Sequence, residues 1–158
     1  LEHTNNMLNV AVNILPLYPK VQSDLVLAGI FLHDIAKTKE LSYDMAFNYT
    51  DHGQLLGHII IGIQMICNKT NILARNGLKI DKAAFDNLLH IIASHHGQYE
   101  FGSPKLPATA EAFMVNYIDD MDAKINQVQS IIEDDPSKDD WTTWVNALQT
   151  KVYKKRID

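Results

Sequence analysis

Histidine and aspartate residues stand at several points of this chain inside or beside apolar sequence, where polar side chains are uncommon. His33 and Asp34 adjoin each other at the end of the most hydrophobic segment, and His58 lies within another apolar run. His95 and His96 follow a third apolar run. A buried carboxylate costs several kcal/mol unless it is paired or bound to a metal. Together these positions indicate a metal site.

The donor set limits the chemistry that such a site can support. Imidazole and carboxylate ligands without thiolates suit Mn, Fe, Co, Ni or Zn, and Mg is less comfortable beside several imidazoles. A carboxylate next to a histidine can bridge two cations roughly 3.5–4 Å apart, as two-metal hydrolases require. A single histidine on an apolar helix is more often a core residue bonded to the backbone. We interpret His52 and His90 as structural or surface residues, and Cys67 as packing.

The elements that position these residues are predicted to be helices, because apolar side chains recur at steps of three and four. Ser23 or Asp24 can cap the second helix. Asp51 with Gln54 forms a capping-box pattern at the third, and Gly97 suits the position after the end of the fourth. The expected helices cover residues 3–14, 23–32, 51–66, 81–97, 114–132 and 137–152.

The fold class predicted from these segments is all-α, a compact bundle of about six helices. Longer loops are expected over residues 37–50 and 97–109, and no convincing strand pattern appears between the helices. We expect one catalytic domain over residues 1–133. Residues 134–158 are predicted to add a C-terminal amphipathic helix that packs on the domain or extends it.

Composition excludes several classes of protein. The chain has 14 Lys+Arg and 19 Asp+Glu, a formal charge of −5, which argues against gripping nucleic acid by charge alone. The single cysteine rules out a disulfide framework. No apolar run approaches ~18 residues and no leader opens the chain, so membrane spanning and secretion are disfavoured and a cytoplasmic location is expected. Oligomeric state is not readable from the sequence.

The order of the candidate ligands resembles the HD-domain superfamily of metal-dependent phosphohydrolases: His3, then His33-Asp34, then His58, then His95-His96, then Asp119. The resemblance covers roughly residues 1–130 and implies two divalent metals. It assigns the first metal to His3, His33, Asp34 and Asp119. It assigns the second to His58 and His95, with His96 as a further ligand or a phosphate contact, and Asp34 as the bridge. Mn²⁺ is favoured, and Fe, Co, Ni, Zn and Mg remain open.

The resemblance also suggests catalytic residues besides the ligands. Lys37 stands one turn after Asp34, where it is expected to contact a phosphate, although a surface lysine would fit the same position. Asp119 is preferred to Asp120 because Asp119 and Asp122 reproduce the Asp-x-x-Asp spacing of the family. Asp122 is expected to orient a ligand or assist proton transfer, and a helix-surface carboxylate is the alternative.

A closer resemblance is to the YhaM-type 3′→5′ exoribonucleases. It rests on four motifs: Leu1-Glu2-His3-Thr4, residues 49–59, residues 94–105, and Asp119 through Lys124. This resemblance implies release of nucleoside 5′-monophosphates from single-stranded RNA, with single-stranded DNA also considered, by a metal-activated water. Members of that family carry an N-terminal OB-fold domain. Since the chain opens almost at the first ligand, we expect that domain to be absent from it.

Substrate contacts are expected from the loop after the histidine pair and from its neighbours. Lys105 is placed to meet the nucleic-acid backbone, and Tyr99 to stack on a base, as Phe101 would, a contact worth ~1–3 kcal/mol. Loop aromatics also anchor loops, so both interpretations stay open. Lys37 and His96 are the other expected substrate contacts.

Two other functions compete with the exoribonuclease. An HD-type nucleotide phosphohydrolase or cyclic-nucleotide phosphodiesterase would use the same metals on a small substrate, since fold and site do not select the substrate. A metal-stabilised binding module would instead dock a partner through the predicted helix with Trp141 and Trp144. The complete ligand set favours an enzyme.

Overall fold

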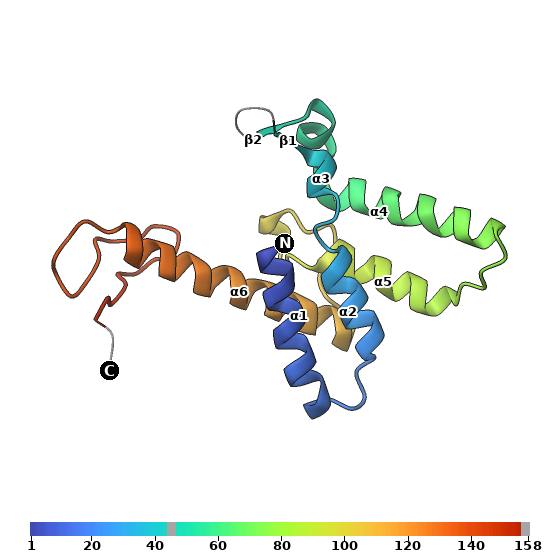
Figure 1. Cartoon of the computed structure of the whole chain (residues 1–158), viewed down its shortest axis with the longest axis horizontal. Helices are drawn as coiled ribbons and strands as arrows, with labels where there is room; N and C mark the ends of the chain where they lie inside the picture. Colours follow the sequence, from blue (N-terminus) through green and yellow to red (C-terminus); the bar gives the residue numbers. More distant parts are fainter. Residues whose placement is uncertain (44–46, 156–158) are drawn as a thin grey trace. The chain divides into compact units, whose positions relative to one another are not determined.

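The computed structural model describes residues 1–43 and 47–155, apart from the side chain of Phe47, in two compact units, Leu1–Asp119 and Asp120–Asp158. The elements in order are α1 (Glu2–Ile14), the 3₁₀ turn η1 (Leu15–Leu17), α2 (Ser23–Leu32), α3 (Lys37–Glu40), β1 (Leu41–Tyr43), β2 (Phe47–Tyr49), α4 (Asp51–Arg75), α5 (Lys82–Ser94), the 3₁₀ turn η2 (Tyr99–Phe101) and α6 (Ala110–Asp134) (Figure 1). The predicted all-α fold class is confirmed.

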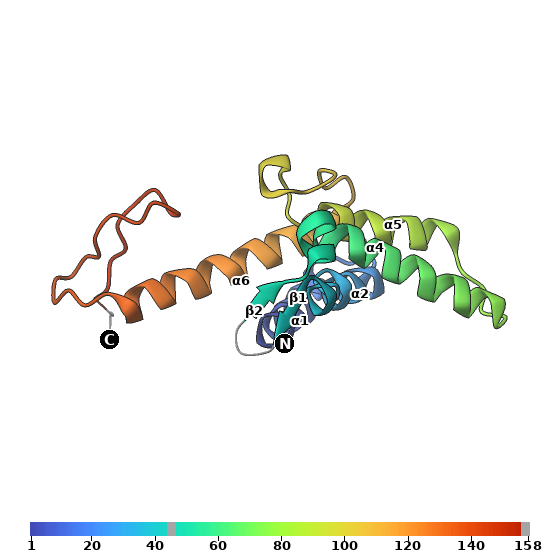
Figure 2. The same ribbon diagram turned by 90° about the horizontal axis from the view of Figure 1, so that it is seen from above.

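The core of the first unit lies where α1, α2 and α5 meet the first turns of α6. Helix α2 packs against both α1 and α5, and α4 runs antiparallel beside α5 in both views (Figures 1 and 2). Each fully buried aliphatic side chain stabilises the fold by ~1.5–3 kcal/mol. This core contains Met7, Ala11, Leu15, Val26, Ile30, Ile91, Ala112, Val115 and Ile118. It fixes the C-terminal end of α2, which carries the His-Asp pair.

The N-caps of α2 and α4 each lie one residue before the predicted cap. The N-cap of α2 is Gln22, whose backbone N–H donates to a side chain of α6, so neither Ser23 nor Asp24 caps this helix. Helix α4 is capped by Thr50, whose hydroxyl accepts from the backbone N–H of Gly53 at 2.9 Å. In both cases the residue just before the predicted cap has the extended backbone that an N-cap requires.

The predicted loop 37–50 contains ordered structure that the sequence pattern did not indicate. The four-residue helix α3 is followed by an antiparallel hairpin that pairs Leu41 with Tyr49 and Tyr43 with Phe47. Residues 44–46 of this loop lie outside the described part of the chain. Helix α3 packs closely against α4. The segment therefore holds a fixed position beside the start of α4.

Helix α4 is interrupted at Gly57, which has φ 70° and ψ 157°. This backbone region is accessible almost only to glycine, because a Cβ would clash with the peptide on either side. The interruption removes the backbone N–H of His58 from the regular helical pattern. Helix α4 therefore consists of two helical segments, and the second begins at His58.

The second unit does not contain the helix predicted over residues 137–152. Instead, isolated antiparallel bridges join Trp141 to Tyr153 and Val145 to Thr150, and the Trp141 and Tyr153 rings lie 4.9 Å apart. The apolar spacing here fits a helix, but aromatic and β-branched residues favour extended backbone. The hydroxyl of Thr142 also accepts from the backbone N–H of Val152 at 2.9 Å.

Residues 156–158 of the predicted C-terminal segment 134–158 lie outside the described part of the chain. No helix within the described ranges is long and apolar enough to cross a membrane.

Candidate metal centre

The His-Asp pair sits at the C-terminal end of α2, where the packing of the core has already fixed the backbone. His33 is 1% exposed, and its Nδ1 donates to the carbonyl oxygen of Ile30 at 2.7 Å. This bond holds the ring so that Nε2 points toward Asp34, 3.3 Å from Oδ2. The local helix geometry thus presents a ring nitrogen and a carboxylate side by side.

Two further histidines follow α5 and are oriented in the same manner. His95 Nδ1 donates to the carbonyl of Ile92 at 2.8 Å, and His96 Nδ1 donates to the carbonyl of Phe101 at 2.8 Å. The turn after them needs Gly97, whose φ is 75° and where a Cβ would clash with the side-chain amide of Asn116. Both rings therefore direct Nε2 away from the backbone.

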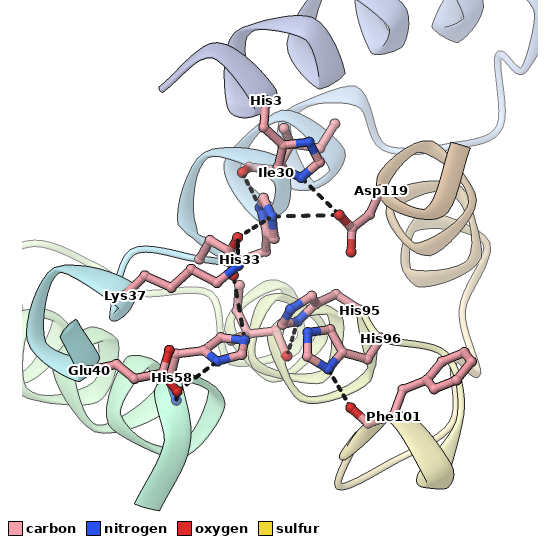
Figure 3. A network of polar contacts seen from close by, with 12 residues as sticks. His3, Ile30, His33, Lys37, Glu40, His58, His95, His96, Phe101 and Asp119 are labelled. Carbon is pink, nitrogen blue, oxygen red and sulfur yellow. Dashed lines mark hydrogen bonds and ion pairs between the residues drawn. The ribbon is translucent and has the colours of Figure 1, made fainter. Parts of the chain in front are cut away.

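The seven predicted metal ligands converge on one region of the first unit, as Figure 3 shows for the labelled histidines and Asp119. His3 Nε2 lies 2.9 Å from Asp119 Oδ1, which is also 4.0 Å from His33 Nε2. His58 Nε2 lies 3.5 Å from Asp34 Oδ1. Ligand atoms of six of these residues fall into two groups, each within 4.8 Å: His3, His33 and Asp34, and then His58, His95 and His96. Asp119 adjoins the first group through its contact with His3.

Asp34 stands between the two groups, because its two oxygens face in different directions. Oδ2 lies near His33 and is 2.6 Å from Lys37 Nζ, whereas Oδ1 faces His58. This arrangement suits a carboxylate that bridges two cations.

Unpaired polar atoms show that the region fits metal ions. In the described ranges, four buried side-chain atoms have no hydrogen-bond partner: Nε2 of His33, His58 and His95, and Oδ1 of Asp34. A buried polar atom without a partner costs about 1–3 kcal/mol, so four of them close together require an explanation. All four are good ligands for a divalent transition metal.

The electrostatics of the site keep most of these donors ready to bind a cation. Burial alone would raise the pKa of Asp34, but the adjacent imidazole of His33 and the ammonium of Lys37 hold that pKa well below its ordinary range. Burial, with the neighbouring His96 and His33, lowers the pKa of His95 to about 3. Burial likewise lowers the pKa of His58, whereas Asp34 raises that of His33 against the effect of burial. Asp34 is thus ionised, and His58 and His95 are neutral, at pH 7.

The remaining predicted residues lie outside the two ligand groups. Lys37 pairs with Asp34, whereas Tyr99 and Lys105 are exposed on the loop after the histidine pair. Burial, and to a smaller extent the charge of Lys105, lowers the pKa of His90. No hydrogen bond or ion pair within the described ranges joins Tyr99 or Lys105 to the ligands. Asp122 belongs to the second unit, where its Oδ2 accepts from Asn126 at 2.9 Å.

The sequence analysis did not identify one residue that contacts a candidate ligand. Glu40 is buried and its Oε1 lies 3.3 Å from His58 Nδ1, so it contacts a candidate ligand directly. In the sequence, Glu40 is a single acidic residue six positions after Asp34, and this spacing alone does not indicate a contact with His58.

This arrangement of histidines and aspartates on a helical scaffold defines a class of protein. The HD domain family model matches residues 1–124, so the chain belongs to the HD domain family.

The relatives agree with this class. The 3′-5′ exoribonuclease YhaM of Bacillus licheniformis is 41% identical over 155 residues, which cover 98% of this chain and 48% of the relative. The YhaM of Bacillus subtilis is 40% identical over 97% of this chain and 47% of the relative, and that of Geobacillus sp. is 37% identical over 98% and 46%. The predicted resemblance is confirmed, and the chain spans about half the length of these relatives. No solved structure matches it.

Proposed function

We propose that this chain is the hydrolytic part of a divalent-metal-dependent 3′→5′ exoribonuclease that releases nucleoside 5′-monophosphates. The observation that carries the proposal is the position of Asp34 between two groups of ligands. The names of the relatives, 3′-5′ exoribonuclease, point to RNA as the substrate class, and we propose that the RNA is single-stranded.

Two metal groups are proposed on the basis of the donor atoms. His3, His33, Asp34 and Asp119 would hold one cation, and His58, His95 and His96 would hold a second that shares Asp34. Mn²⁺ is the favoured ion for this mixture of imidazole and carboxylate. Bound divalent cations supply Lewis acidity, which lowers the pKa of water and offsets negative charge on phosphate oxygens.

The chain's own residues position the substrate around these ligands. Lys37 is half exposed beside Asp34, so its ammonium can reach a phosphate oxygen while it remains near the ligands. His96 is held by a loop carbonyl, and the same loop carries Lys105 and Tyr99, which we propose to contact the RNA backbone and a base. Asp122 is retained as a proposed residue for proton transfer.

The test is to incubate the purified chain with Mn²⁺ and a 5′-labelled single-stranded RNA oligomer. Parallel reactions contain a chelator or use mononucleotides as substrate. We expect a ladder that shortens from the 3′ end and is lost with chelator. Asp119→Asn should abolish it, whereas the matched variant Asp120→Asn should not, because Asp120 is exposed and pairs with Lys124. An intact oligomer beside cleaved mononucleotides would replace this proposal with a small-substrate phosphohydrolase, which the net charge of −5 would suit.

A further inference from the structure

Glu40 is buried against one side of His58, although glutamate is among the residues least often buried without a partner. It ends α3 and is 8% exposed. Its Oε1 accepts from the backbone N–H of His58 at 3.0 Å and from His58 Nδ1 at 3.3 Å. The interruption at Gly57 makes this possible, because it leaves the N–H of His58 outside the helical pattern. Figure 3 shows Glu40 on one side of the His58 ring and His95 and His96 on the other.

This contact differs from those of the other oriented histidines. The Nδ1 atoms of His33, His95 and His96 each donate to a neutral backbone carbonyl. Only His58, among these four, donates to a carboxylate. A carboxylate partner on the outer nitrogen makes an imidazole a stronger ligand and fixes the direction of its inner nitrogen.

The charges of the two ligand groups explain why this difference matters. The first group contains the carboxylates of Asp34 and Asp119 beside His3 and His33. The second group, His58, His95 and His96, consists of imidazoles alone and has only Oδ1 of Asp34 as a shared carboxylate. A divalent cation in the second group would therefore meet less negative charge. Glu40, whose Oε1 lies 3.3 Å from His58 Nδ1, supplies a compensating carboxylate behind this ligand.

We propose that Glu40 is a positioning residue for the second metal group, which it supports by aiming His58 Nε2 inward and by supplying negative charge behind the ring. The inference rests on the proposed two-metal function. In this proposal Glu40 strengthens the binding of the second cation through His58 and does not contact the substrate.

A purely structural role for Glu40 makes a different prediction. Its carboxylate also caps the second segment of α4 at His58, which would stabilise that segment whether or not metal is present. Glu40→Gln separates the two roles, because the amide oxygen can still accept both hydrogen bonds while the charge is lost. Glu111→Gln is a matched control, since Glu111 is 7% exposed, accepts from a backbone N–H and lies against Gln22 and Asn87 instead of the ligands.

The experiment titrates Mn²⁺ into the metal-stripped full chain and measures free Mn²⁺ by its paramagnetic resonance signal. Wild type and Glu111→Gln should each bind two ions. Glu40→Gln should bind the first ion as wild type does and the second about 10–100-fold more weakly. In a His58→Ala background, adding Glu40→Gln should change Mn²⁺ binding no further, because the effect of Glu40 passes through His58.

The outcomes separate this inference from the function on which it rests. Equal titrations of wild type and Glu40→Gln would overturn the role of Glu40 and leave the two-metal proposal intact. Fewer than two ions bound by wild type would overturn both. Equal weakening of both ions in Glu40→Gln, or an additional loss in the His58→Ala background, would show that Glu40 acts through the fold instead of through His58. Thermal melts of the metal-free variants confirm that each is folded during the titration.

Discussion

The carboxylate of Asp34 has neighbours of two kinds, and they make opposite demands on it. The candidate ligands around it direct lone pairs at a shared space, whereas Lys37 brings a positive charge to within 2.6 Å of Oδ2. A cation beside a metal ligand weakens metal binding by charge repulsion. A lysine at this position is therefore better explained by contact with an anionic substrate than by support of metal binding.

Replacing Lys37 should consequently separate metal binding from hydrolysis. We expect Lys37→Met to bind Mn²⁺ at least as well as wild type and to hydrolyse RNA about 10²–10³-fold more slowly, since one donor to the developing charge is lost. Metal content by mass spectrometry and turnover of labelled RNA measure the two effects. Lys39→Met, an exposed lysine of the same short helix, is the control. Unchanged turnover in Lys37→Met would make Lys37 a surface lysine.

The candidate ligands could be singled out from the sequence because their order along the chain resembles that of a known family: His3, His33-Asp34, His58, His95-His96 and Asp119. The structure brings these residues together, and their binding of metal stays a prediction. Glu40 could not be found in this way. Its importance depends on the break at Gly57 and on the packing of α3 against α4, and both are tertiary features.

The start of α2 shows how one helix holds another in place around the site. Glu111, in the first turn of α6, accepts from the backbone N–H of Gln22 at 2.9 Å and from the amide of Asn87 at 3.3 Å. These three residues come from α6, the start of α2 and α5. A buried carboxylate thus links the elements that carry His33, His95 and Asp119.

This link should make the stability of the fold depend on pH in a defined direction. Burial raises the pKa of Glu111, but its hydrogen bonds outweigh burial and leave the pKa below the ordinary 4.5. A folded-state pKa below the unfolded value means that the stabilising effect is present above pH 4.5 and is lost as the pH falls through the folded-state value.

We therefore expect Glu111→Ala to lower the free energy of unfolding by about 1–3 kcal/mol at neutral pH, because the N–H of Gln22 loses its partner. The difference from wild type should shrink below pH 4.5. Urea unfolding of the metal-free protein at neutral pH and below pH 4.5 measures this difference. Glu111→Gln, which keeps an acceptor, should lose less free energy of unfolding than Glu111→Ala. A difference that grows in acid would refute the assigned role of the Glu111 charge.

Periodicity predicted the long helices correctly and failed where two structures compete for the same pattern. Apolar steps of three and four located α1, α2, α4, α5 and α6, because each helix buries apolar side chains against its neighbours. The segment after α6 has the same spacing, but the contact between Trp141 and Tyr153 and the bonds of Thr142 favour paired extended strands. Cross-strand partners distant in sequence decide this competition, and a local pattern does not contain them.

At the scale of the whole molecule, the metal-free fold carries a cost that the site itself explains. Four buried polar atoms without hydrogen-bond partners gather in the first unit, and each destabilises the folded state relative to the hydrated unfolded chain. The unfolded chain does not hold these atoms together, so a cation that binds them binds the folded state selectively. Metal binding and folding are therefore linked.

The last prediction follows from this linkage. Mn²⁺ at about 100 times its dissociation constant should stabilise the fold by about 2.7 kcal/mol per site, which raises the melting temperature by roughly 5–10 °C for a protein of this size. A thermal melt of the chelated chain, repeated at increasing Mn²⁺, measures the shift. Asp34→Asn should abolish most of it, because Asp34 faces both ligand groups. A melting temperature that does not respond to Mn²⁺, Zn²⁺ or Co²⁺ in wild type would mean that these atoms do not form a metal site, and the proposed hydrolysis would lose its chemical basis.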